Sequence, residues 1–194
     1  GYTFAGWYTS STYATKITGL ALGNTGNKTV YAKWTANKYI IKFTGNGANS
    51  GSMAAMTNRL YNQTYALTAN AYKRTGYTFT GWNTRADGKG TQYANKASVR
   101  NLTSVNGKTI VLYAQWVKTK YSVLYALNGG KNSSANPTSY YYSSSAITLK
   151  NPTRLGYTFK GWYTSTAYTT KVTAIAARST GAKRFYAKWT ANTY

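Results

Sequence analysis

The sequence lacks the side chains from which most active sites are built. It holds no cysteine, no histidine and a single acidic residue, Asp87, among 194 residues. Disulfides and thiolate metal sites are excluded, and catalytic carboxylate pairs, Ser-His-Asp triads and His-carboxylate metal clusters cannot form within one chain. Asp87 lies in Ala86-Asp87-Gly88-Lys89-Gly90, a composition typical of turns. We therefore expect no enzyme, no catalytic residue, no cofactor and no metal.

Long apolar segments are also missing. No run of residues approaches the length of a transmembrane helix, and no stretch has the pattern of a secretion signal. Apolar residues nowhere recur with the spacing of a long amphipathic helix. These absences favour a protein made mostly of β-strands.

Acidic side chains are scarce although basic ones are common. Lys and Arg number 24 against one acid, which gives a net charge of +23. The basic residues are spread along the chain and the longest contiguous runs are pairs, so they do not form a basic tail. Three explanations are open: a surface that binds polyanions, a sequence engineered to be poor in acids, or residue identities that depart from the natural gene product.

Two short motifs recur in the same order along the chain. The first has three copies, Gly-Tyr-Thr-Phe-Ala-Gly-Trp at residues 1–7, Gly-Tyr-Thr-Phe-Thr-Gly-Trp at 76–82 and Gly-Tyr-Thr-Phe-Lys-Gly-Trp at 156–162. The second reads Tyr-Ala-Lys-Trp at 31–34, Tyr-Ala-Gln-Trp at 113–116 and Tyr-Ala-Lys-Trp at 186–189, and the two motifs together contain all six tryptophans. The chain is therefore a tandem array of one small module.

The distance between copies indicates separate small domains rather than the turns of a solenoid. We expect residues 39–116 and 121–189 to be complete repeats and residues 1–34 to be the C-terminal half of another. That half would be completed by preceding residues or by a partner molecule. Residues 190–194 are expected to be a linker and the start of a further repeat.

Alternation of apolar and polar residues predicts the strands. Tyr121, Val123, Tyr125 and Leu127 share one face of a first strand, which ends at the turn signal Asn128-Gly129-Gly130. Residues 110–116 and 185–189 alternate in the same way and predict closing strands. Residues 172–177 fit either a strand or a short helical turn.

The ordered motifs carry a family resemblance. The pattern running from residues 121–130 through 152–164 to 185–189 resembles the Listeria–Bacteroides repeat, an internalin B-repeat-like module of bacterial surface proteins. The resemblance implies a β-grasp-like fold, an extracellular location and a role as a spacer or interaction module. The expected fold class is therefore mostly β within α+β, with small β-grasp-like domains arranged as beads on a string.

Large aromatic residues divide into an expected core and an expected surface. A small domain has few other large side chains, so we predict that the motif aromatics form the core. They are Phe4, Trp7, Trp34, Phe79, Trp82, Trp116, Phe159, Trp162 and Trp189. Three consecutive tyrosines, Tyr140, Tyr141 and Tyr142, must expose at least one ring on a strand, and we predict a contact surface there.

Repetition and composition together predict a non-enzymatic structural role. The expected function is that of a repeat protein in an extracellular bacterial surface stalk or filament, with partners that are further copies of itself or neighbouring repeats of a longer chain. The alternative is an adhesive module that binds anionic glycans or other cell-surface polyanions through basic and aromatic side chains. Nucleic acid is disfavoured because no recognised nucleic-acid motif accompanies the basic residues.

Overall fold

The structure, a computed structural model, describes residues 1–193. Those residues form strands β1 to β17 and contain no helix, so the fold is all-β and the helical part of the expected α+β class is wrong. The chain divides into two compact units, Gly1–Lys73 with Phe79–Gln115, and Arg74–Thr78 with Trp116 onward. The expected start of a further repeat at Tyr194 lies outside the described residues.

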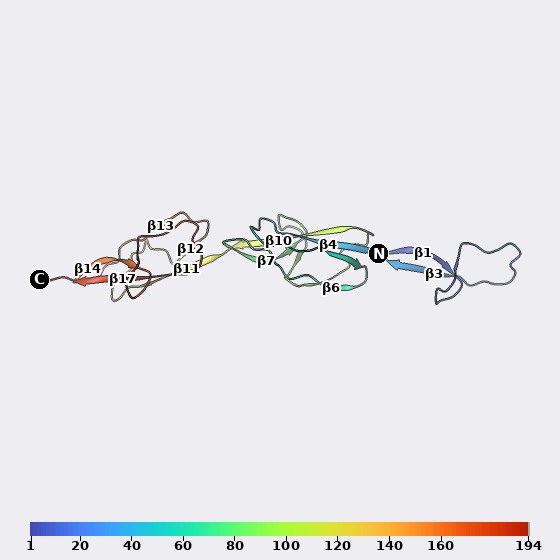
Figure 1. The fold of residues 1–194 in the computed structure, drawn as a ribbon, viewed down its shortest axis with the longest axis horizontal. Helices are drawn as coiled ribbons and strands as arrows, with labels where there is room; N and C mark the ends of the chain where they lie inside the picture. Colours follow the sequence, from blue (N-terminus) through green and yellow to red (C-terminus); the bar gives the residue numbers. More distant parts are fainter. Residues whose placement is uncertain (194) are drawn as a thin grey trace. The chain divides into compact units, whose positions relative to one another are not determined.

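Residues 1–36 form a small sheet of three strands. Strands β1 (Tyr2–Tyr8), β2 (Lys16–Ile17) and β3 (Tyr31–Ala36) pair in the order β2-β1-β3. Figure 1 shows β1 and β3 running side by side in opposite directions. β1 and β3 carry the two recurring motifs, and no strand within residues 1–193 pairs with the free edge of β3.

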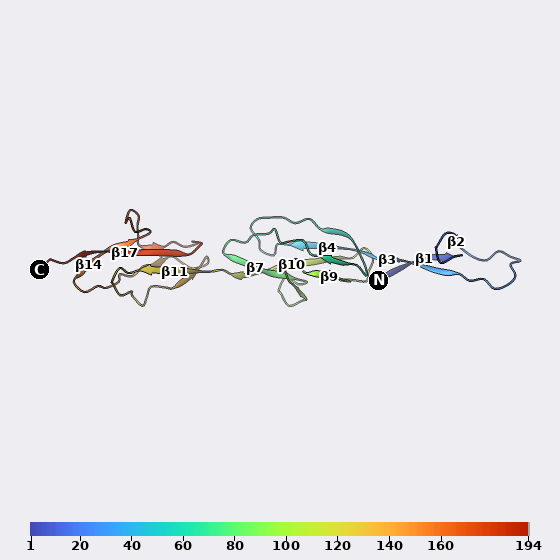
Figure 2. The same ribbon diagram turned by 90° about the horizontal axis from the view of Figure 1, so that it is seen from below.

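Each complete repeat is built on a five-stranded sheet. In the first, the order β5-β4-β10-β7-β8 joins β4 (Lys38–Thr44), β5 (Met56–Leu60), β7 (Tyr77–Asn83), β8 (Gln92–Tyr93) and β10 (Thr109–Lys118). In the second, the order β12-β11-β17-β14-β15 joins β11 (Lys120–Ala126), β12 (Ser139–Tyr141), β14 (Tyr157–Tyr163), β15 (Lys171–Val172) and β17 (Lys183–Ala191). The two orders are equivalent strand for strand, and β14 and β17 lie side by side in Figure 2.

A two-stranded sheet accompanies each five-stranded one. β6 (Thr64–Ala66) pairs with β9 (Ser98–Arg100), and β13 (Ile147–Thr148) pairs with β16 (Ala174–Ile175). Residues 172–177, for which a strand and a helical turn were both open, therefore supply the end of β15 and the whole of β16. Leu149 beside β13 and Ile175 in β16 are buried, so the small sheet covers one face of the repeat core.

A β-bulge explains why the first motif has its particular spacing. Phe159 and Trp162 are three residues apart, and regular alternation would place their side chains on opposite faces of the strand. The pairing of β14 with β17 skips one residue between Phe159 and Gly161, so both aromatics turn to the same face. Their ring centroids lie 5.4 Å apart. Gly161 has φ +138°, a conformation that residues with a Cβ rarely adopt.

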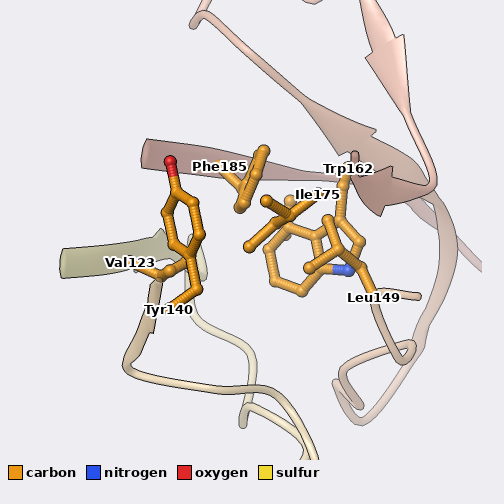
Figure 3. Packing of buried hydrophobic residues seen from close by; sticks show 7 residues of the cluster. Val123, Tyr140, Leu149, Trp162, Ile175 and Phe185 are labelled. Carbon is orange, nitrogen blue, oxygen red and sulfur yellow. The ribbon is translucent and has the colours of Figure 1, made fainter. Parts of the chain in front are cut away.

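The core of residues 121–189 is organised around Trp162. The buried cluster consists of Val123, Tyr140, Leu149, Trp162, Ile175, Phe185 and Ala187, all in strands of the two sheets except Leu149, which follows β13 (Figure 3). In that view the Trp162 indole lies beside Leu149 and Ile175. Its Nε1–H donates to the carbonyl oxygen of Lys150 at 3.0 Å, so the one polar atom of the ring is satisfied.

Burial of one tyrosine makes the stability of the repeat of residues 121–189 vary with pH in the alkaline range. The hydroxyl of half-buried Tyr125 donates to the carbonyl oxygen of Pro137 at 3.0 Å, and burial raises the pKa of Tyr125 to about 12. The unfolded chain loses this proton near pH 10. The contribution of neutral Tyr125 to stability is therefore complete below about pH 10 and is lost as the pH rises toward 12.

We expect the urea midpoint of residues 121–189 to be level from pH 7 to 9 and to fall between pH 10 and 12. Tyr125→Phe cannot ionise, so it should flatten part of that fall. The midpoint is followed at each pH by the methyl signals of Val123 and Ile175 in the core, which do not exchange with solvent. An identical fall in the variant and the parent chain would contradict the assignment.

Candidate functional site

The first and last strands of each complete repeat are parallel neighbours. β4 pairs in parallel with β10 from Ile40 opposite Thr109 to Thr44 opposite Tyr113. β11 pairs in parallel with β17 from Val123 opposite Lys183 to Ala126 opposite Tyr186. The chain enters each repeat along one of these strands and leaves along the other. A pull on the two ends of a repeat therefore acts along the hydrogen-bonded pair in opposite directions.

A second recurring feature lies where one repeat ends and the next begins. We call it the clasp: the first glycine of the Gly-Tyr-Thr motif, its threonine, the residue that follows the closing strand, and a tyrosine of the next repeat. In the first clasp the backbone N–H of Asn37 donates to Gly1 O at 2.9 Å, and the N–H of Tyr61 donates to Asn37 O at 2.8 Å. The ring of Tyr61 covers Gly1 so closely that a Cβ there would collide with it.

The second clasp repeats this geometry with different side chains. The N–H of Thr119 donates to Gly76 O at 2.9 Å, and the hydroxyls of Thr78 and Thr119 share a hydrogen bond of 2.8 Å. Gly76 is buried, and a Cβ there would meet Tyr142. Tyr142 corresponds to Tyr61 because each follows the strand residue that pairs with the lysine just before its repeat, Lys120 or Lys38.

The three tyrosines predicted as a contact surface are in three different environments. Tyr140 is only 3 % exposed, and its hydroxyl donates to Gly181 O at 2.6 Å. Its place on a contact surface is therefore wrong, because β12 turns this ring into the core. Tyr141 points to solvent. Tyr142 is half-buried against Gly76.

The aromatic residues predicted as core differ in burial, and the most exposed of them lie in residues 1–36. Trp82 and Trp162 are fully buried. Phe79, Trp116, Phe159 and Trp189 are half-buried, and Trp189 Nε1 donates to Leu127 O at 2.9 Å. Phe4, Trp7 and Trp34 are 43 %, 47 % and 58 % exposed, so their expected core position is wrong in the described structure. The reason is that no strand equivalent to β11 covers them within residues 1–193.

The single acid has a local structural role. Asp87 accepts hydrogen bonds from the backbone N–H of Lys89 at 3.0 Å and from the guanidinium of Arg85, which also forms an ion pair with it at 2.8 Å. These bonds, that of Lys89 first, hold the pKa of the Asp87 carboxyl below its usual range. Among residues 1–193 no group of His, Cys, Asp or Glu side chains could hold a metal ion.

Several basic side chains lie against tyrosine rings. Lys188 Nζ is 5.6 Å from the centre of the Tyr163 ring and 5.4 Å from that of Tyr168. Lys33 takes the same position between Tyr8 and Tyr13. Arg154 stacks on Tyr157 with its guanidinium carbon 3.6 Å from the ring centre. Such contacts order basic groups at a surface that has almost no carboxylates to pair with them.

Recurrent sheets, parallel end strands and clasps define a tandem β-repeat protein. The chain belongs to the Listeria-Bacteroides repeat domain family, whose model matches residues 1–33, 39–115 and 121–188. This confirms the resemblance of the motifs to that family. The repeat family is associated with bacterial surface proteins, and no catalytic activity is known for it.

Two relatives from Evansella cellulosilytica match the whole chain. One, named "Putative Gly-rich membrane protein", is 33 % identical over 204 residues, and the other, named "Putative membrane protein", is 27 % identical over 201. The chain spans only 23 % and 27 % of their lengths. No solved structure matches the chain. The part of the chain that the structure describes contains no helix long and apolar enough to cross a membrane.

Proposed function

We propose that this chain is a mechanical spacer, part of an extracellular stalk or filament on a bacterial surface. The observation that carries the proposal is the parallel pairing of the first and last strands in both complete repeats. Tension along the chain loads that pair in shear, so the ladder hydrogen bonds must fail together. An antiparallel pair pulled from its open end loses its bonds one at a time and resists less.

The clasps support the same role. Each links the end of one repeat to the next through backbone hydrogen bonds and a tyrosine ring, so tension passes from repeat to repeat through more than a single covalent bond. The mixed sheet with a central parallel pair is also the arrangement expected of a β-grasp-like repeat without its helix.

The unfolding force of a repeat pulled by its ends, compared with a pull across an antiparallel pair, tests the proposal.

A second function is favoured by one specific observation, the charge. With 24 basic residues, one acid and one ion pair within residues 1–193, nearly all positive charges are available to a polyanion. The alternative is therefore an adhesive module that binds anionic glycans or similar polymers of the cell surface. Tyrosines ordered by lysines, as at Tyr163 and Lys188, would add stacking on sugar rings.

A salt titration separates the two functions. Heparin serves as a model polyanion. If charge drives binding, its association constant with the chain should fall steeply between 50 and 500 mM salt. The logarithm of that constant should fall against the logarithm of the salt concentration with a slope of about one for each anionic group that the chain neutralises. Dextran, an uncharged polymer, is the control ligand. Retention of heparin at high salt, or equal binding to dextran, would exclude an electrostatic adhesive role.

A further inference from the structure

The last repeat carries a clasp that lacks its tyrosine among the described residues. The N–H of Asn192 donates to Gly156 O at 2.9 Å, the same distance as at the other two clasps. Thr158 Oγ1 donates to Asn192 Oδ1 at 2.7 Å, as Thr3 does to Asn37. The half of the clasp that belongs to the finished repeat is therefore fully formed.

The backbone at this site already has the docking conformation. Gly156 has φ +73°, against +77° for Gly76 in the second clasp. Arg154 covers Tyr157 from one side, as Arg74 covers Tyr77. A ring that docks here would meet a preformed surface and would lose little free energy to reordering it.

The space occupied by a tyrosine in the other clasps is open here. No heavy atom of the described residues lies within 4 Å of the position that a Cβ on Gly156 would take, whereas Tyr142 fills that position at Gly76. Around the opening, Leu155 is 100 % exposed and Tyr157 is 37 % exposed. Both side chains therefore offer apolar area beside the open backbone of Gly156.

We propose that Gly156, Tyr157, Leu155 and Asn192 form a docking surface for the tyrosine-bearing turn of a further repeat of this family. The occupant is indicated by the chain itself, because Tyr61 and Tyr142 occupy the equivalent surfaces at Gly1 and Gly76. Glycine has no Cβ, so the tyrosine ring can lie directly against its backbone. The inference rests on the proposed function, in which successive repeats transmit tension to one another.

The test extends the chain by one repeat. Residues 1–193 are followed directly by a second copy of residues 121–189, so that its first tyrosine takes the place of Tyr194. We expect hydrogen exchange at the Asn192 amide to slow by about tenfold, which corresponds to roughly 1.4 kcal/mol. Tyr142→Ala in the added copy should restore the original rate, and Tyr141→Ala, which removes an exposed ring, should not.

Two variants of the unextended chain serve as positive controls for the effect of a clasp tyrosine on amide exchange. Exchange at Asn37 and Thr119 should quicken with Tyr61→Ala and Tyr142→Ala in the unextended chain, because those clasps are already occupied. If they respond and Asn192 does not, the docking surface is refuted and the spacer function stands. Should the added copy fail to protect its own β11 amides, residues 39–116 are appended instead, with Tyr61 as the occupant. No slowing at Asn192 with a folded repeat of either kind overturns the proposal.

Discussion

Replacing Trp162 by alanine should unfold the repeat of residues 121–189. The indole is buried among side chains from both sheets, and its Nε1–H holds the carbonyl of Lys150 (Figure 3). Removing it leaves a large cavity, at a cost of about 3–5 kcal/mol, while the Lys150 carbonyl keeps its hydrogen bond from the Asn136 side chain. Small domains have total stabilities of about 5–15 kcal/mol, so little of the folded state would remain.

The matched control is Trp7→Ala, at the same motif position in residues 1–36. Trp7 is 47 % exposed and its contacts with Phe4 are at the surface, so the loss there should be a fraction of that at Trp162. Urea unfolding, followed by the amide signals of β1 and β14 separately, measures both losses. Equal losses at the two positions would show that Trp162 does not organise a core.

Replacing Gly81 by alanine is expected to cost about 3 kcal/mol or more, the second largest effect. Gly81 stands in β7 at the motif position that the bulge glycine Gly161 has in β14; its φ is +146°, and a Cβ there would lie 2.7 Å from the carbonyl oxygen of Tyr93. Backbone strain alone accounts for about 1–3 kcal/mol, and the paired strand must also move. Movement of the bulge would turn Phe79 or Trp82 away from the core.

Gly107→Ala controls for backbone strain in the same repeat. Gly107 has φ +74°, and no described heavy atom lies within 4 Å of the position of an added Cβ, so only the left-handed conformation is penalised, by about 1–2 kcal/mol. Urea midpoints of the two variants give the comparison. A Gly81→Ala chain as stable as Gly107→Ala would mean that the bulge relaxes freely and does not fix the register.

The sequence carries local information about strands but little about which strands pair. Alternation correctly indicates β11 and β17, because each has one buried face. Their parallel pairing has no such signal, since the partners are far apart in sequence and either neighbour order would bury the same residues. Alternation therefore does not reveal the parallel pairing on which the proposed function rests, and the structure shows it directly.

The clasp was equally hidden in the sequence. The residue after the closing strand is Asn37, Thr119 or Asn192. Each of them binds the motif glycine through its backbone N–H, so the bond does not depend on side-chain identity and leaves no motif in the sequence. The run Tyr140-Tyr141-Tyr142 shows the opposite difficulty, because identical side chains give no hint of which faces the core. Strand β12 and its pairing with β11 decide this, placing Tyr140 inside and leaving Tyr142 for the clasp.

The most direct test of the spacer function is the force that unfolds residues 121–189 in two pulling directions. Since the chain has no cysteine, Lys120→Cys with Thr190→Cys attaches handles near the outer ends of β11 and β17, and Thr158→Cys with Thr190→Cys attaches them across one antiparallel pair. Forced unfolding reports the barrier along each direction in the same folded repeat. We predict a clearly higher force for the first attachment, in which β11 and β17 shear, and an equal or lower force there would contradict the spacer function.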